Sequence, residues 1–133
     1  MKYKIIAIIS GSLLSAFGGL AQNAIKLVEL AKSKKPDFAC ILIEEHQLRV
    51  SSKDIARLAA LINSTSICSH LITSDSSFIP KTRTTESILA TWFLLQLIDH
   101  QGYVRSTGTH TVTENDVRRV KLWLLTQGPI KKL

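Results

Sequence analysis

The sequence lacks the residue patterns that usually mark a metal site or a known catalytic centre. Its 133 residues include only two cysteines, Cys40 and Cys68, and their spacing matches no zinc-binding pattern. It contains no catalytic triad signature, no Walker loop and no G-x-G-x-x-G loop. It also has no internal repeat and no low-complexity segment. We therefore predict that the protein holds neither a metal ion nor another cofactor.

Positive charge is in excess, but it is spread along the chain. The net charge is +7 and the isoelectric point is near 9.7, with no long run of lysine or arginine that would mark a disordered arm. Such a basic surface attracts polyanions, namely nucleotides, nucleic acids or acidic membranes, and the alternative is charge that serves solubility alone. The length and apolar content predict a single domain over residues 1–133. We expect a polyanionic ligand such as a nucleotide or an oligonucleotide.

The first 45 residues predict a strand, a turn, a long helix and a second strand. Ile5–Ile9 is an uncharged, isoleucine-rich run, typical of a strand that is buried on both faces. Serine and glycine at 10–12 break this run, and apolar residues then recur at three- and four-residue steps over Leu13–Lys32. A second apolar run covers Phe38–Glu44. This order has the length of a βαβ unit, which requires a parallel sheet.

The same stretch can also be interpreted as an export signal over residues 1–21. Two lysines near the start would form its positive end, and Gly19-Leu20-Ala21 would form its cleavage site. Because no other charge occurs before Lys26, the segment could also remain as a membrane anchor. The remainder would then be a small periplasmic interaction protein, in which Cys40 and Cys68 could form a disulfide. The polar stripe of the predicted helix continues past residue 21, and this favours the sheet.

The remainder of the chain predicts a third strand, further helices and a short hairpin. The third strand is expected at Ile67–Thr73, the helices at Ser51–Ile62, at Thr84–His100 and from Thr113 onward, and the hairpin at Gly102–Val112. In the last helix Val117, Val120, Leu124 and Leu125 are expected to face inward. The predicted fold class is therefore α/β, with a small, mainly parallel sheet flanked by helices and with C-terminal helices that include a short hairpin.

The helix at Thr84–His100 is the most apolar of the chain. It contains no lysine or arginine, so it cannot present the basic face that a DNA-reading helix needs in the groove. Large apolar side chains cover nearly all of its sides, as expected for a central packing helix or a subunit interface. We predict a homodimer without a DNA-reading helix.

The best candidate for a binding site is the turn after the first predicted strand. Ser10, Gly11 and Ser12 would lie between a buried strand and a helix, where backbone N–H groups and the positive end of the helix favour an anion such as phosphate. Arg49 and Arg105 could supply countercharge. Many small α/β domains have such a turn without using it, so the turn alone does not define the ligand.

Candidates for chemistry follow the second and third predicted strands. Glu44 and His46 come directly after one strand and Asp75 after the next, at the carboxyl ends where open α/β sheets bind ligands. Carboxylates beside a histidine could act in acid–base chemistry, and the alternative is a charged loop in solvent. His70 interrupts the third strand, and we interpret it as a satisfied interior or edge histidine.

Three segments of the chain together resemble a known family. The order of Lys4–Ser12, Lys35–Ile43 and Ser51–Ile62 is similar to that of the Rossmann-like sensor domains of CRISPR-associated proteins, the CARF type. The resemblance covers about half of the chain and concerns pattern more than signature residues. In that family the first turn and the strand ends bind cyclic oligoadenylate, usually across a dimer, and some members cleave it.

This resemblance implies a cytoplasmic, nucleotide-binding domain with a role in CRISPR-associated antiviral defence. Such a domain would be a cyclic-oligonucleotide sensor or a small phosphodiesterase. The sequence does not contain the catalytic residues of a nuclease of this family. The alternative function remains that of an exported interaction protein.

Overall fold

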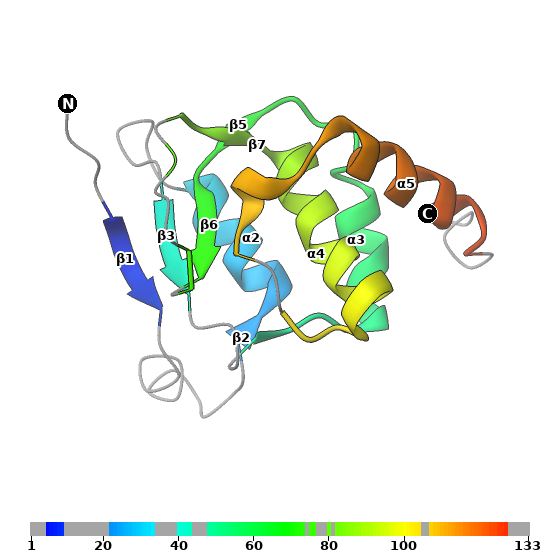
Figure 1. Ribbon diagram of the computed structural model, residues 1–133, viewed down its shortest axis with the longest axis horizontal. Coiled ribbons are helices and arrows are strands. Elements are labelled where there is room, and N and C mark those ends of the chain that lie inside the picture. Colours follow the sequence, from blue (N-terminus) through cyan, green and yellow to red (C-terminus); the bar gives the residue numbers. More distant parts are fainter. Residues whose placement is uncertain are drawn as a thin grey trace.

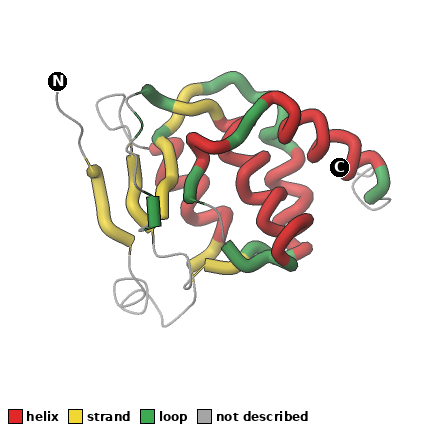
Figure 2. The backbone as a smooth tube through the Cα atoms, in the orientation of Figure 1, coloured by secondary structure: helices red, strands yellow, loops and turns green. Residues whose placement is uncertain are grey.

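The protein is a mixed α/β structure with a small sheet at one side and the helices packed beside it (Figures 1 and 2). The computed structural model describes residues 5–9, 22–33, 40–43, 48–73, 75–76, 80, 82–104 and 107–127. The predicted fold class is confirmed at this level, because the helices accompany a small parallel sheet and a short antiparallel strand pair.

The central sheet is parallel and follows the order of the sequence. Its strands are β1 (Ile5–Ile9), β3 (Cys40–Ile43) and β6 (His70–Thr73), in the order β1-β3-β6. Both strand pairs are parallel, and Ile43 is the partner of Ile9 on one side and of Thr73 on the other. The predicted parallel arrangement of the first two strands is therefore confirmed.

The long helix predicted at Leu13–Lys32 is wrong in its middle part. Gln22–Asn23 form a short strand, β2, which pairs in parallel with β4 (Leu48–Arg49), and helix α2 begins only at Ala24 and ends at Ser33. The apolar spacing could not reveal this break, because it records which side chains face inward and not which backbone groups pair with a distant segment. Residues 10–21 lie outside the described part.

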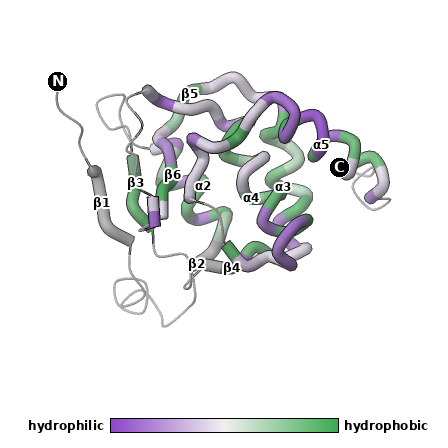
Figure 3. Tube along the Cα trace, viewed as in Figure 1, coloured by the Kyte–Doolittle hydropathy of each residue, from purple (hydrophilic) through white to green (hydrophobic). Residues whose placement is uncertain are grey.

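Helix α2 packs with one face of the sheet to form the core. Its buried residues follow helical spacing: Ala24, Leu27, Val28 and Ala31. Ile41, Ile43 and Leu71 of the sheet belong to the same buried cluster. Because side chains alternate along a strand, Cys40 and His70 point to the opposite face. Figure 3 shows β3 in the hydrophobic colour.

A capping box starts the next helical segment at Ser51, where the sequence predicts the start of a helix. Ser51 accepts a hydrogen bond from the Lys53 N–H at 3.3 Å, and the Asp54 carboxylate accepts one from the Ser51 N–H at 3.0 Å. These bonds satisfy N–H groups that would otherwise lack partners at the helix start. A 3₁₀ turn, η2 (Ser52–Asp54), leads into helix α3 (Ile55–Ala59). The helix is shorter than predicted.

Helix α4 (Glu86–His100) is the central packing helix that the sequence predicts. Its fully buried residues include Leu89, Trp92, Phe93 and Leu94, which contact the core cluster from the helix centre. At roughly 1.5–3 kcal/mol for each large side chain removed from water, this helix supplies much of the stability of the core. No helix within the described ranges has both the length and the apolar character to cross a membrane.

The third predicted strand is divided into two. Ile67–Cys68 form β5, which pairs antiparallel with β7 (Thr84–Thr85), whereas β6 joins the parallel sheet. Between them, the Ser69 N–H donates a hydrogen bond to the Ala31 carbonyl at the end of α2. This contact redirects the chain from one ladder to the other.

The hairpin predicted at Gly102–Val112 does not form among the described residues of this stretch, and residues 105–106 lie outside the described part. Its described residues form separate contacts instead: Tyr103 bridges Arg49, Gly108 bridges Ile72, and Thr109–Thr111 form a 3₁₀ turn, η3. Alternating side chains indicated strands here, but the partners of these residues are distant segments. The described residues of this stretch therefore form no strand pair with one another.

Helix α5 (Glu114–Leu125) begins with a second capping box. The Thr113 hydroxyl accepts from the Asp116 N–H at 3.3 Å, and the Asp116 carboxylate accepts from the Thr113 N–H at 2.9 Å. Val120 and Leu124 face inward as predicted, but the prediction for Leu125 is wrong, because its side chain is 69% exposed. The helix extends away from the sheet side of the molecule (Figure 1).

The residues that follow α4 offer a paired test of this backbone path. Gly102 has a φ of +94°, and a Cβ at this position would collide with the Val50 carbonyl oxygen. We expect Gly102→Ala to lower the free energy of unfolding by at least about 2 kcal/mol. Gln101 ends α4 in the left-handed region with φ 56°, so Gln101→Gly should raise it by roughly 0.5–1 kcal/mol.

Urea denaturation of both variants and of the natural protein measures this difference. Opposite signs at neighbouring positions are expected. Equal stability of the Gly102→Ala variant and the natural protein would contradict the described turn.

Candidate functional site

The carboxyl ends of the parallel strands define the candidate site. Ile9, Ile43 and Thr73 end their strands in one register, so the segments that follow them start from the same edge of the sheet. The predicted residues Ser10 and Glu44 come next in the sequence. Both residues lie outside the described part of the chain. The same is true of four further candidates: Gly11, Ser12, His46 and Arg105.

Asp75 lies at this edge, as predicted. It is exposed and follows the end of β6, where the Ser76 N–H donates to the Thr73 carbonyl at 3.0 Å and so closes a turn around it. An exposed carboxylate in such a turn is open to solvent and to a ligand at the strand ends. The structure thus places one of the three candidates for chemistry.

Arg49 is the predicted countercharge that the structure describes, and it lies against an aromatic ring. The central carbon of its guanidinium is 4.8 Å from the ring centroid of Tyr103, a cation–π contact. Arg49 is exposed, and Tyr103 is 47% exposed. The pair therefore presents a positive charge and an aromatic surface side by side to solvent.

Backbone hydrogen bonds hold this pair in place. Arg49 is paired with Asn23 through the β2–β4 ladder and with Tyr103 through an antiparallel bridge. The adjacent Val50 N–H donates to the Gly102 carbonyl at 2.7 Å. The sequence analysis missed Tyr103, because Gly102–Val112 was interpreted as a hairpin that pairs only with itself.

The Arg49–Tyr103 pair belongs to the same side of the molecule as the strand ends. Only five residue steps separate Ile43 from Leu48, so β4 begins within roughly 18 Å of the end of β3. Figure 1 shows β2, the partner of β4, on the side toward which the arrows of β3 and β6 point. Asp75 and the Arg49–Tyr103 pair therefore belong to the same side of the molecule.

His70 is an interior histidine on the other face of the sheet, as the sequence analysis predicts. Its Nδ1 lies 2.8 Å from the Thr109 hydroxyl oxygen, which also accepts a hydrogen bond from the Leu71 N–H at 3.1 Å. Burial lowers the pKa of His70 to about 4; the neighbouring His110 also lowers it, and the Thr82 backbone partly offsets this. His70 is therefore neutral at pH 7 and contributes no charge to the candidate site.

The two cysteines are free thiols, and the disulfide considered for an exported protein is not formed. Cys40 is directed to the Pro80 carbonyl at 3.8 Å, whereas Cys68 belongs to the core on the helix side. Burial raises the pKa of Cys40 to about 11. Burial, followed by the charge of Glu86, raises that of Cys68 to about 12, with Lys32 acting in the opposite direction. Both thiols are thus protonated and unsuited to nucleophilic catalysis.

A buried carboxylate that the sequence analysis missed lies far from the strand ends. Glu86, the first residue of α4, is 9% exposed and accepts a hydrogen bond from the Ser64 hydroxyl at 2.8 Å. The Lys32 ammonium at the end of α2 lies 3.9 Å from its second oxygen. Helix α2 runs from the carboxyl edge to the opposite edge of the sheet, so Lys32 at its end lies at that opposite edge. The cluster therefore joins the end of α2 to the start of α4, and we assign it a structural role.

Comparison of the chain with models of known protein families, with curated proteins and with solved structures gives no match. Within the ranges that the structure describes, no group of three or more His, Cys, Asp or Glu side chains is arranged to hold a metal ion. The function must therefore be argued from the carboxyl edge itself.

The buried imidazole predicts a dependence of stability on pH. The folded pKa of His70 is about 4, below the ordinary value of 6.5, so the unfolded chain binds the proton more readily between these values. The contribution of His70 to stability should be constant well above pH 6.5 and should fall as the pH drops toward 4, with a slope that approaches about 1.4 kcal/mol per pH unit.

Urea denaturation across this range tests the slope, and His70→Gln serves as the comparison because glutamine does not titrate. The difference in unfolding free energy between the two proteins should narrow as the pH falls. A difference that stays constant from pH 7 to pH 4.5 would show that His70 is not buried in its neutral form.

Proposed function

We propose that the protein binds a nucleotide or an oligonucleotide at the carboxyl edge of a Rossmann-like sheet. The observation that carries this proposal is the exposed Arg49–Tyr103 pair on the side of the molecule where the parallel strands end. Open parallel sheets bind ligands at this edge. The predicted cytoplasmic location, the homodimer and the resemblance to CARF-type sensors belong to the same proposal.

The chemistry of the pair fits the two parts of a nucleotide. A base stacks on an aromatic ring with roughly 1–3 kcal/mol per base, and an arginine beside the ring can bind a phosphate. Tyr103 and Arg49 are held in register by backbone bonds, so little ordering is needed on binding. The net charge of +7 adds a general attraction for polyanions.

Hydrolysis of a bound phosphodiester would require further groups at the same edge. Glu44, His46 and Asp75 are the candidates, with a carboxylate or the imidazole acting as general base toward water. Asp75 supports this role by its position after β6. Binding without hydrolysis, as in a sensor, requires none of these three residues.

The alternative of an exported interaction protein has less support. Removal of residues 1–21 would also remove β1, a strand of the parallel sheet. The free thiols of Cys40 and Cys68 also differ from the disulfide that an exported protein could form. The binding proposal uses the whole sheet and needs no processing step.

Calorimetric titration with AMP, ATP, linear oligoadenylate and cyclic oligoadenylate tests the proposal. We expect at least one of these probes to bind the natural protein. Tyr103→Ala should weaken that binding by about 5- to 150-fold, whereas Tyr103→Phe should preserve it because the ring can still stack. Arg49→Gln should weaken binding and reduce its salt dependence by about one phosphate contact.

Arg57→Gln is the matched control, because Arg57 is an exposed arginine on α3, an element that carries neither Arg49 nor Tyr103. This variant should bind like the natural protein. The site is rejected if none of the probes binds. It is also rejected if the natural protein and the Tyr103→Ala variant bind a probe with equal affinity.

A further inference from the structure

Helix α5 carries an exposed surface that the nucleotide site does not use. Leu122 and Leu125 are 65% and 69% exposed, although both are large apolar side chains. Each lies one turn after a basic residue: Arg118 precedes Leu122 by four positions, and Lys121 precedes Leu125 by four. These four residues, which we call the α5 outer patch, form one continuous area on the helix side turned away from the core.

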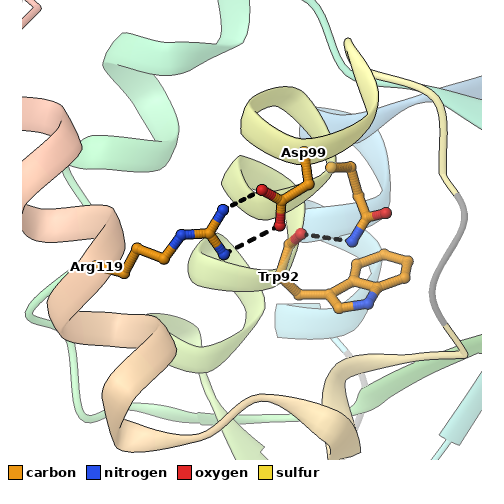
Figure 4. A network of polar contacts seen from close by, with 4 residues as sticks. Trp92, Asp99 and Arg119 are labelled. Carbon is orange, nitrogen blue, oxygen red and sulfur yellow. Dashed lines mark hydrogen bonds and ion pairs between the residues drawn. The ribbon is translucent and has the colours of Figure 1, made fainter.

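The two cations of the patch are not held in ion pairs with described residues, although the exposed Glu114 lies one turn before Arg118. Arg118 donates a hydrogen bond to the neutral Asn115 side chain at 3.1 Å, and neither Arg118 nor Lys121 forms an ion pair with a described residue. Arg119, on a different side of the helix, is used internally and binds the Asp99 carboxylate of α4 (Figure 4). The pKa of Arg119 is raised, first by this hydrogen bond. Arg119 is thus paired within the molecule, whereas Arg118 and Lys121 face solvent on another side of the helix.

We propose that the α5 outer patch docks an acidic amphipathic helix of a partner protein. Charge complementarity carries this choice: the patch offers two cations and two leucines one turn apart, and the matching surface has carboxylates and apolar side chains at the same spacing. A helix laid against α5 reads such anchors at three- and four-residue steps. Figure 3 shows both hydrophilic and hydrophobic colour along α5.

Other occupants fit the patch less well. A second copy would bring four positive charges into one interface, and only the exposed Glu114 of each copy, one turn before Arg118, could offset them in part. Nucleic acid would leave both leucines without an apolar partner. An anionic bilayer needs a wide apolar face, but the wide apolar face of α5 is buried against α4 through Val120 and Leu124, and Glu114 lies exposed at the start of the helix.

A peptide display selection shows whether the patch prefers a partner helix with acidic or with basic side chains. The probe is a library of helix-favouring peptides of roughly 18 residues, somewhat longer than α5, with one face randomised over Leu, Ala, Gln, Glu, Asp, Lys and Arg. We expect the natural protein to enrich peptides that combine leucine with Glu or Asp, with dissociation constants in the micromolar range or weaker because the patch is small.

Two double variants locate the binding. Leu122→Gln with Leu125→Gln, and Arg118→Gln with Lys121→Gln, should each reduce the affinity of an enriched peptide by at least about 10-fold. The matched control, Arg57→Gln with Arg83→Gln, removes the same amount of charge from exposed positions outside α5 and should bind like the natural protein. Trp123, half-buried on α5, provides a fluorescence signal, and unchanged melting temperatures show that the variants remain folded.

Several results would overturn the proposal. These are enrichment of no peptide or of basic peptides, and an equal loss of affinity in the control variant. Binding of phosphatidylglycerol vesicles that depends on Leu122 and Leu125 would assign the patch to a membrane. A dimer in sedimentation experiments that the leucine variants abolish would assign it to a second copy. None of these results bears on the nucleotide site, which lies on other elements.

Discussion

The parallel pairing of β3 with both of its neighbours is the constraint on which the rest of the structure depends. Because Ile43 is in register with Ile9 and with Thr73, the sheet has one edge at which the strands end and one at which they begin. The Arg49–Tyr103 pair belongs with the first edge, and the Glu86 cluster lies far from it. The positions of the proposed binding surface and of the buried Glu86 carboxylate therefore follow from one ladder.

The two faces of this sheet have different chemistry. Ile41 and Leu71 contact the helices and form the apolar core, whereas Cys40 and His70 lie among polar neighbours on the other face. Burial is the largest cause of the shifted pKa of both groups, and at His70 the neighbouring His110 acts in the same direction. Cys40 and His70 on this outer face are thus buried without ion pairs to described residues.

Much of the fold could be predicted from local signals, because these signals are encoded within a few residues. The serine and threonine caps at Ser51 and Thr113 each have their carboxylate three positions later, and the apolar content of α4 required burial. The strand at Gln22–Asn23 and the bridges of the predicted hairpin could not be predicted in this way. Their partners lie far away in the sequence, and residue type alone does not identify them.

The candidate site divides along the same line. Arg49 could be predicted as a countercharge because a cation near a strand end needs no knowledge of its partner. Tyr103 could not, since its importance arises only when the chain brings it beside Arg49.

The bridge that Gly108 forms with β6 has a consequence for association between molecules. This bridge to Ile72, with the Thr73 N–H bound to the Thr107 carbonyl, occupies the outer side of β6, so no foreign strand can add there and fibril growth from that side is blocked.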